Sequence, residues 1–101
     1  MVRALVGVEP GAMREMADRL RQKHGSAVIA LGSNLGEKVA ILVAVTPDLT
    51  DRAKAGDIVK QIAPIVGGSV GGRPDMAQAG GRDASKLNEA LERVFSVLAG
   101  G

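Results

Sequence analysis

The sequence predicts an α/β protein: a single small domain in which a mixed β-sheet of about four strands packs with three helices. Short apolar runs bounded by turn residues alternate with longer segments whose apolar residues recur every three to four positions. Their order is strand, helix, two strands, helix, short strand and helix. The 101 residues are 46% hydrophobic, which is enough for one buried core.

The first half of the chain is expected to form a strand, a helix and a β-hairpin. The expected elements are a strand at residues 2–8, a helix at residues 11–24, and hairpin strands at residues 27–31 and Val39–Val45. Gly25 stands at the usual position after a helix end. Asn34 and Gly36 are turn formers, which places the hairpin tip between the two apolar runs, with Lys38 close to it. Arg14 is among the polar residues assigned to the outer side of the first helix.

The second half of the chain is expected to hold two helices that flank a glycine-rich stretch. The expected elements are a helix from residue 50 or 51 to residue 66, a short strand at residues 76–79 and a helix at residues 84–99. Thr50 or Asp51 would cap the first of these helices, and Pro64 would bend or end its last turn. Asp83 is a good N-cap for the final helix.

The glycine tract, which we define as residues 67–81, reads GGSVGGRPDMAQAGG. So many glycines predict a backbone that passes close to another surface, or that bends where no Cβ fits. Gly72 and Gly80 are therefore expected to be required by backbone geometry, through a positive φ or close packing. Exposed amides in a glycine-rich turn can hold an anion, and Arg73 offers a planar donor fork that suits phosphate.

The composition argues against an active site or a metal centre. The chain has no cysteine, and His24 is its only histidine, so thiolate chemistry, a serine triad and a histidine metal site all lack their residues. His24 is better explained as a cation at a helix end. The glycines of the tract lead into Arg73 and Pro74, not into the lysine and hydroxyl residue of a phosphate-binding Walker loop. A net charge of +2 permits an anionic partner, while Phe95, the sole aromatic residue, cannot form a platform for stacked bases.

Residues 71–81, GGRPDMAQAGG, resemble the signature of the C-terminal domain of alanyl-tRNA synthetases. In that family a glycine tract precedes Arg-Pro-Asp, then Ala-Gln-Ala-Gly-Gly, and then a final amphipathic helix. The rest of the chain is similar to the family in layout. The same domain type is appended to DHH-type phosphoesterases, which carry histidine at the place of Arg73. Arg73 therefore favours the synthetase branch.

This resemblance implies a C-terminal tRNA-binding domain over residues 1–101, non-catalytic in itself, of a cytoplasmic, ATP-dependent alanine–tRNA ligase. Such a domain grips the outer corner of tRNA and supports aminoacylation and editing by the full-length enzyme. No cofactor is expected in this domain, because ATP, Mg²⁺ and Zn²⁺ belong to other domains of that enzyme. The chain by itself is expected neither to activate alanine nor to hydrolyse mischarged tRNA. The implied partners are alanine tRNA or another structured nucleic acid, the other synthetase domains and, in some members, a second copy; no membrane partner is implied.

The expected nucleic-acid site combines the glycine tract with nearby cations. Its residues are Lys38, Gly71, Gly72, Arg73, Pro74, Gln78, Gly80, Gly81 and Arg82. Lys54, Lys60 and Lys86 would widen the basic surface if the fold brings them together. With few cations and one aromatic ring, recognition should rest on shape and phosphate contacts, and affinity should fall as salt rises.

Three other interpretations of the same residues stay open at the level of sequence. The chain could be the substrate-binding domain of a DHH-type phosphoesterase or nuclease. It could be a dimerisation module that does not bind RNA. The tract could also be purely structural, with its glycines allowing close packing of helix on sheet and Arg73 paired with Asp75 or with a helix C-terminus.

Overall fold

One mixed β-sheet forms the centre of the computed structural model, which describes residues 2–49, 54–67, 69–72 and 76–99. Its strands are β1 (Val2–Val6), β2 (Val28–Asn34), β3 (Val39–Val45), β4 (Ser69–Gly72) and β5 (Met76–Gly81). Their spatial order is β1-β2-β3-β5-β4. β1 runs parallel to β2, and every other pair of neighbours is antiparallel.

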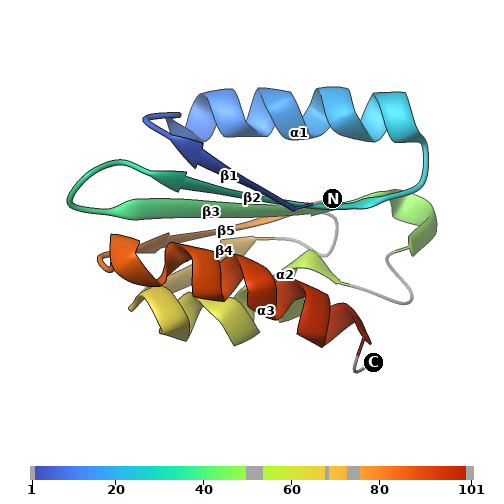
Figure 1. Ribbon diagram of the computed structural model, residues 1–101. Helices are drawn as coiled ribbons and strands as arrows, with labels where there is room; N and C mark the ends of the chain where they lie inside the picture. Colours follow the sequence, from blue (N-terminus) through green and yellow to red (C-terminus); the bar gives the residue numbers. More distant parts are fainter. Residues whose placement is uncertain (1, 50–53, 68, 73–75, 100–101) are drawn as a thin grey trace.

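Three α-helices cover this sheet, one on one face and two on the other (Figure 1). α1 (Pro10–His24) lies alone on its face, whereas α2 (Ala55–Ile62) and α3 (Leu87–Ala99) lie side by side on the opposite face. Short 3-10 turns occupy Pro47–Leu49, Ala63–Val66 and Ala84–Lys86. The predicted fold class, a mixed sheet packed with three helices, is confirmed. In the described ranges, no helix is long and apolar enough to cross a bilayer.

β3 lies at the centre of the sheet and is buried along its whole length. Its side chains alternate between two apolar clusters, because successive residues of a strand point to opposite faces. Ile41 and Val43 belong to the cluster beneath α2 and α3, and Leu42 belongs with Met13 to the cluster beneath α1. Burial on both faces explains why β3 reads in the sequence as one unbroken apolar run.

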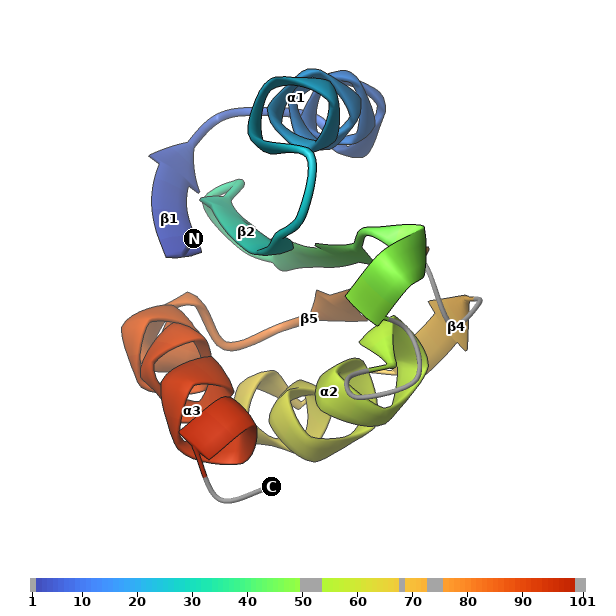
Figure 2. The ribbon, with the colours of Figure 1, turned by 90° about the vertical axis from the view of Figure 1, so that its right-hand side faces the viewer.

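The two faces of the sheet are covered to different extents. α2 packs on β3, β4 and β5, and α3 packs on β1 and β2, so together they span the sheet. The packing of α1 is concentrated on β2 and β3. Figure 2 shows α1 above these strands and β4 at the far edge of the sheet. Among the described residues, Met76 of β5 still packs against the cluster beneath α1, whereas Gly80, farther along β5, is exposed.

The strands differ from the predicted ones at their ends and by one added member. β1 stops at Val6 instead of residue 8, because Gly7 turns the chain with a φ of 70°. β2 continues past residue 31 to Asn34, because residues 32–34 pair with β3 on one side and with β1 on the other. The hydroxyl of buried Ser33 also accepts a hydrogen bond from the Val8 amide at 3.0 Å. The hairpin tip lies where it was predicted, with Gly36 at a φ of 96°. β4 is a strand that the sequence analysis assigned to a glycine loop.

The helices also differ from prediction in where they begin. The caps proposed at Thr50 and Asp51 lie outside the described residues, and α2 starts only at Ala55, because Lys54 has an extended backbone. The bend predicted at Pro64 is confirmed: the α-helix ends at Ile62, and a 3-10 turn continues into the glycine tract. The Asp83 cap is confirmed as well, since its carboxylate accepts a hydrogen bond from the Ser85 amide at 3.1 Å.

The close approach of helix to sheet occurs at Gly32 of β2, which the sequence analysis did not single out. A Cβ at this position would lie 2.8 Å from a methyl carbon of Leu87 and 3.1 Å from the methyl carbons of Leu91. Both leucines belong to α3. Gly32 therefore allows α3 to pack directly on the backbone of β2.

Candidate nucleic-acid interface

The described part of the glycine tract consists mainly of strands and not of a loop. Residues 69–72 form β4 and residues 76–81 form β5, paired antiparallel from Ser69↔Gly80 to Gly72↔Ala77. Arg73, Pro74 and Asp75 lie outside the described residues. β5 has β3 on one side and β4 on the other, so its backbone amides are engaged in ladders and are not free to cradle an anion. The contacts that β5 can offer to a partner come from its side chains and from its shape.

The ladder divides the tract between the two faces of the sheet. Ala77 and Ala79 point into the cluster beneath α2 and α3, so Gly72, the ladder partner of Ala77, belongs to that face. Gly81 is buried and follows the same alternation. Gln78 and Gly80 face the α1 side, since their partners across β3, Leu42 and Ala40, belong to the cluster beneath α1.

We call the α1 side of β5 and β4 the open face; it comprises Ser69, Gly71, Gln78 and Gly80 by register. Of the predicted residues, Gly71, Gln78 and Gly80 share this face, whereas Gly72 and Gly81 do not. Two of these four positions, Gly71 and Gly80, carry no side chain. A partner can therefore approach the backbone of the sheet closely here.

The prediction that Gly80 is required by backbone geometry is wrong. Its φ lies outside the left-handed region, and a Cβ built there would meet no atom within 4 Å. Gly80 is exposed and paired on both sides as an ordinary strand residue. Glycine weakens a strand interior relative to residues with side chains. The fold of the described chain therefore gives no reason for glycine at this position.

Arg14 of α1 reaches the open face, although the sequence analysis assigned it to the outer side of its helix. With its amide oxygen directed at α1, Gln78 accepts hydrogen bonds from Nε of Arg14, at 3.2 Å, and from Nη2. Arg14 is exposed and Gln78 is partly buried. The periodicity of α1 could not reveal this contact, because it shows only which helix face is apolar and not what lies beside the polar flank.

Two more cations stand at one end of the open face. Val39 and Gly81 are ladder partners; Lys38 precedes the first of them and Arg82 follows the second. These two exposed side chains therefore emerge next to each other, where β3 begins and β5 ends. Both residues belong to the predicted site, and the pairing of β3 with β5 places them at adjacent strand ends.

The predicted residues do not converge on a single point, however. Gly72 and Met76 lie at the opposite end of β5 from Arg82. Five steps along a strand span about 17 Å. The described site residues thus form a strip along β5, with Lys38 and Arg82 at one end.

The lysines proposed to widen the basic surface lie elsewhere. Lys60 is exposed on α2, and Lys86 is exposed at the turn that leads into α3. Lys54 precedes α2. All three belong to the layer of α2 and α3, on the far side of the sheet from the open face. The expected enlargement of the basic surface is not observed.

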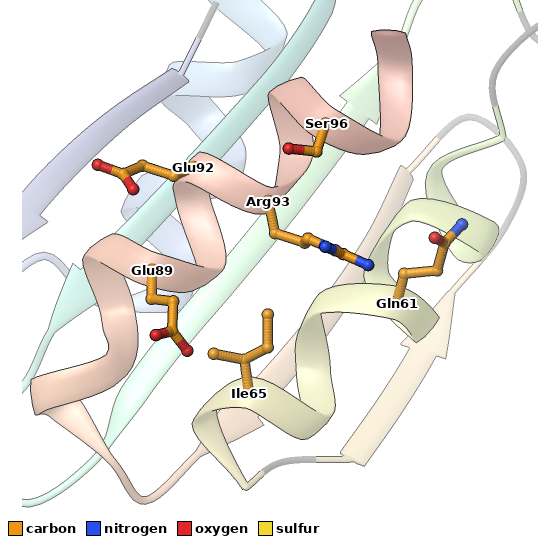
Figure 3. A pocket seen from close by; sticks show the side chains of 6 residues that line it. All are labelled: Gln61, Ile65, Glu89, Glu92, Arg93 and Ser96. Atoms are coloured by element: carbon orange, nitrogen blue, oxygen red, sulfur yellow. The ribbon is translucent and has the colours of Figure 1, made fainter. Parts of the chain in front are cut away.

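An open groove of about 430 Å³ lies between α2 with its following turn and α3 (Figure 3). Its lining residues are Gln61, Ile65, Glu89, Glu92, Arg93 and Ser96. Figure 3 shows Arg93 extended from α3 toward α2, and Glu92 directed away. Two carboxylates beside one guanidinium do not favour a polyanion. Within the described part of the chain, no three His, Cys, Asp or Glu residues gather in a way that could hold a metal ion.

A sheet face that carries glycine positions, an amide and a helix arginine, with two cations at its end, is suited to binding an anionic partner. The class of protein follows from the comparison with family models: the DHHA1 domain model matches residues 1–100, so this chain belongs to the DHHA1 domain family.

Within that family the close relatives are alanine–tRNA ligases. The chain is 57% identical over 88 residues to the alanine–tRNA ligase of Anaeromyxobacter dehalogenans, an alignment that covers 87% of the chain and 10% of that enzyme. It is 50% identical over 98 residues to the enzyme of Shewanella amazonensis, covering 97% of the chain and 11% of that enzyme. The chain thus spans about a tenth of the length of these curated relatives. The predicted resemblance to alanyl-tRNA synthetase is confirmed.

Solved structures give the same result at the level of the domain. The C-Ala domain of Aquifex aeolicus alanyl-tRNA synthetase matches with a TM-score of 0.89 at 30% identity, over 96% of this chain and 87% of that one. RecJ from Thermus thermophilus matches with a TM-score of 0.69 at 18% identity, over 99% of this chain and 15% of that one. The RecJ match shows the shared fold alone.

Proposed function

We propose that this chain is the C-terminal tRNA-binding domain of an alanine–tRNA ligase, which grips the outer corner of tRNA and supports aminoacylation and editing by the full-length enzyme. The observation that carries the proposal is the match to the C-Ala domain of an alanyl-tRNA synthetase over nearly the whole of both chains. The open face and its cations support it physically. ATP, Mg²⁺ and Zn²⁺ are assigned to other domains of that cytoplasmic enzyme, and none to this one.

The proposed mode of binding relies on shape and on phosphate contacts. Arg14, Lys38 and Arg82 are exposed cations along or beside the open face, and Gly80 leaves room for a close approach. Phosphate contacts position an RNA without reading its sequence, and structured RNA is recognised largely by its shape. Discrimination of alanine tRNA from other tRNAs is therefore assigned to other parts of the synthetase.

The DHH-type phosphoesterase alternative has weaker support. The relatives from Anaeromyxobacter and Shewanella, at 57% and 50% identity, are alanine–tRNA ligases, whereas the RecJ likeness is only 18% identical. Arg73 also stands where the phosphoesterase branch carries histidine. A dimerisation module without RNA binding would be recognised in gel filtration by a dimer that tRNA does not shift.

The test is a titration of the chain with alanine tRNA, a second tRNA and a DNA duplex at two salt concentrations. We expect both tRNAs to bind more tightly than the duplex, and affinity to fall with salt by a slope that corresponds to a few phosphates. Arg73→Ala should lower tRNA affinity by about 1–3 kcal/mol, the usual worth of a charge-assisted contact, with little change in Tm. Equal affinity for duplex and tRNA, or affinity that ignores salt, would contradict the proposal.

A further inference from the structure

The guanidinium of Arg14 on α1 donates hydrogen bonds to the uncharged amide of Gln78 on the open face. Most of its N–H donors are not used in this contact. Nε and Nη2 both donate to the amide oxygen of Gln78. A guanidinium has five N–H donors in a fixed fork. One from Nε and one from Nη2 are engaged by Gln78, so the pair of terminal nitrogens retains three. These point from the exposed end of a side chain and have the geometry that a phosphate group takes in bidentate fashion.

Among the described residues, no carboxylate forms an ion pair with Arg14. The ion pair observed in the described ranges joins Arg21 to Asp18, also on α1. Asp18 lies one turn after Arg14 but is engaged by Arg21. An amide acceptor orients a guanidinium without neutralising it, whereas a carboxylate in the same place would do both. The described partner of Arg14 is therefore an uncharged amide.

The position of this pair relates it to the proposed interface. Gln78 and Gly80 point to the same side of β5, two residues apart, and a Cβ at Gly80 would meet only open space. Lys38 and Arg82 stand at the nearby end of the same strand. A polyanion that lies along the open face would therefore contact the guanidinium of Arg14 beside the flat surface that Gly80 leaves.

We propose that Arg14 is a phosphate-contacting residue of the interface and that Gln78 is the residue that positions it. This inference rests on the proposed function, because it assigns a second segment of the chain, α1, to the surface that binds RNA. The competing explanation is mechanical: the same hydrogen bonds could simply fasten α1 to β5. The two explanations differ in what happens when the charge of Arg14 is neutralised without loss of the tether.

Gln78→Glu makes that distinction. The carboxylate would keep the contact with Arg14 and strengthen it as an ion pair, so a purely mechanical role predicts an unchanged or higher Tm and unchanged tRNA affinity. A phosphate-contacting role predicts an unchanged or higher Tm and an affinity roughly tenfold lower, the loss of one charge-assisted contact.

Arg14→Gln is the companion variant, and Arg19→Gln is its matched control, since Arg19 is also an exposed arginine of α1. We expect Arg14→Gln to weaken tRNA binding roughly tenfold and to reduce the salt slope by about 1, whereas Arg19→Gln should change affinity less than about twofold. A mechanical tether would change Tm and leave the salt slope as it is.

The double variant separates an effect through Arg14 from general repulsion. If Gln78→Glu acts by neutralising Arg14, it should have little further effect in the Arg14→Gln background, so that the two changes are not additive. Fully additive losses, or a Gln78→Glu variant that binds tRNA as tightly as wild type, would overturn the inference while the proposed function stands. A wild-type chain that binds no tRNA would overturn the proposed function and the inference with it.

Discussion

The two faces of the sheet in this domain differ in how completely they are covered. Beneath α2 and α3 the inner strands of the sheet are covered, with Ile41, Val43 and Ala77 fully or almost fully buried. On the other face α1 covers the centre, and Gly80 remains exposed beyond it. A small domain gains its stability from a well-packed core, and a binding surface must stay accessible. In this domain the face beneath α2 and α3 packs the core, and part of the α1 face stays accessible.

Glycine has opposite meanings on the two faces. At Gly32, beneath α3, a side chain would overlap Leu87 and Leu91, so glycine serves packing inside the protein. At Gly80, on the open face, a side chain would meet nothing. A count of glycines in the sequence does not distinguish these cases, because the distinction lies in what each backbone position faces.

The largest effect is expected from Gly32→Val. Its side chain would be forced into the methyl groups of Leu87 and Leu91, and overpacking of this kind costs about 1–3 kcal/mol. For a domain of this size each kcal/mol lowers Tm by roughly 4–8 °C. Thermal unfolding followed by circular dichroism measures the loss. A wild-type Tm would show that α3 can withdraw from β2 freely, and that the covered face is not tightly packed.

The same substitution on the open face, Gly80→Val, should lower tRNA affinity and leave stability almost unchanged. Stability should stay within about 0.5 kcal/mol of wild type, as for an ordinary surface change, because φ is unstrained and the space is empty. Affinity for tRNA should fall about fivefold or more, near 1 kcal/mol, because the side chain obstructs close approach. Ala4→Val, at an exposed position of β1, is the control and should alter neither. An unfolded Gly80→Val variant would instead support the prediction from sequence that backbone geometry or close packing requires glycine at this position.

The smallest effect is expected at a contact that belongs to neither face. Ser26 donates a hydrogen bond to Asp48, and the hydroxyls of Ser26 and Thr46 hold the pKa of Asp48 below its usual range. Because the folded pKa is depressed, this stabilisation is present at neutral pH and is lost as pH falls below about 4, through the folded pKa.

Ser26→Ala should therefore lower Tm slightly near pH 7 and leave it unchanged at strongly acidic pH. Melting curves of both proteins from pH 7 to pH 2 measure this, with Ser96→Ala on α3 as a control that should show no pH-dependent difference. A difference between wild type and Ser26→Ala that persists at the lowest pH would assign it to something other than the ionised carboxylate.

Most of the secondary structure could be predicted because its signals are local. The apolar run of β3, the turn residues at Asn34 and Gly36, and the Asp83 cap each depend on residues a few positions apart. The errors arose where the deciding contact was distant in sequence. Ser33 belongs to β2 because it pairs with Leu5 and Ala40, and the strand at residues 69–72 exists because residues 77–80 pair with it.

For the candidate site, the sequence by itself determined which residue types were available. It provided a glycine tract, an amide at Gln78, scattered cations, one histidine and no cysteine, and its motif led to the family. The tertiary structure alone decided which of these share a surface. It brought Arg14 to Gln78, set Lys38 beside Arg82, turned Gly81 inward and left Gly80 outward. The physical reason is that sheet register and helix placement depend on pairings between distant segments, whereas composition and periodicity report only on neighbours along the chain.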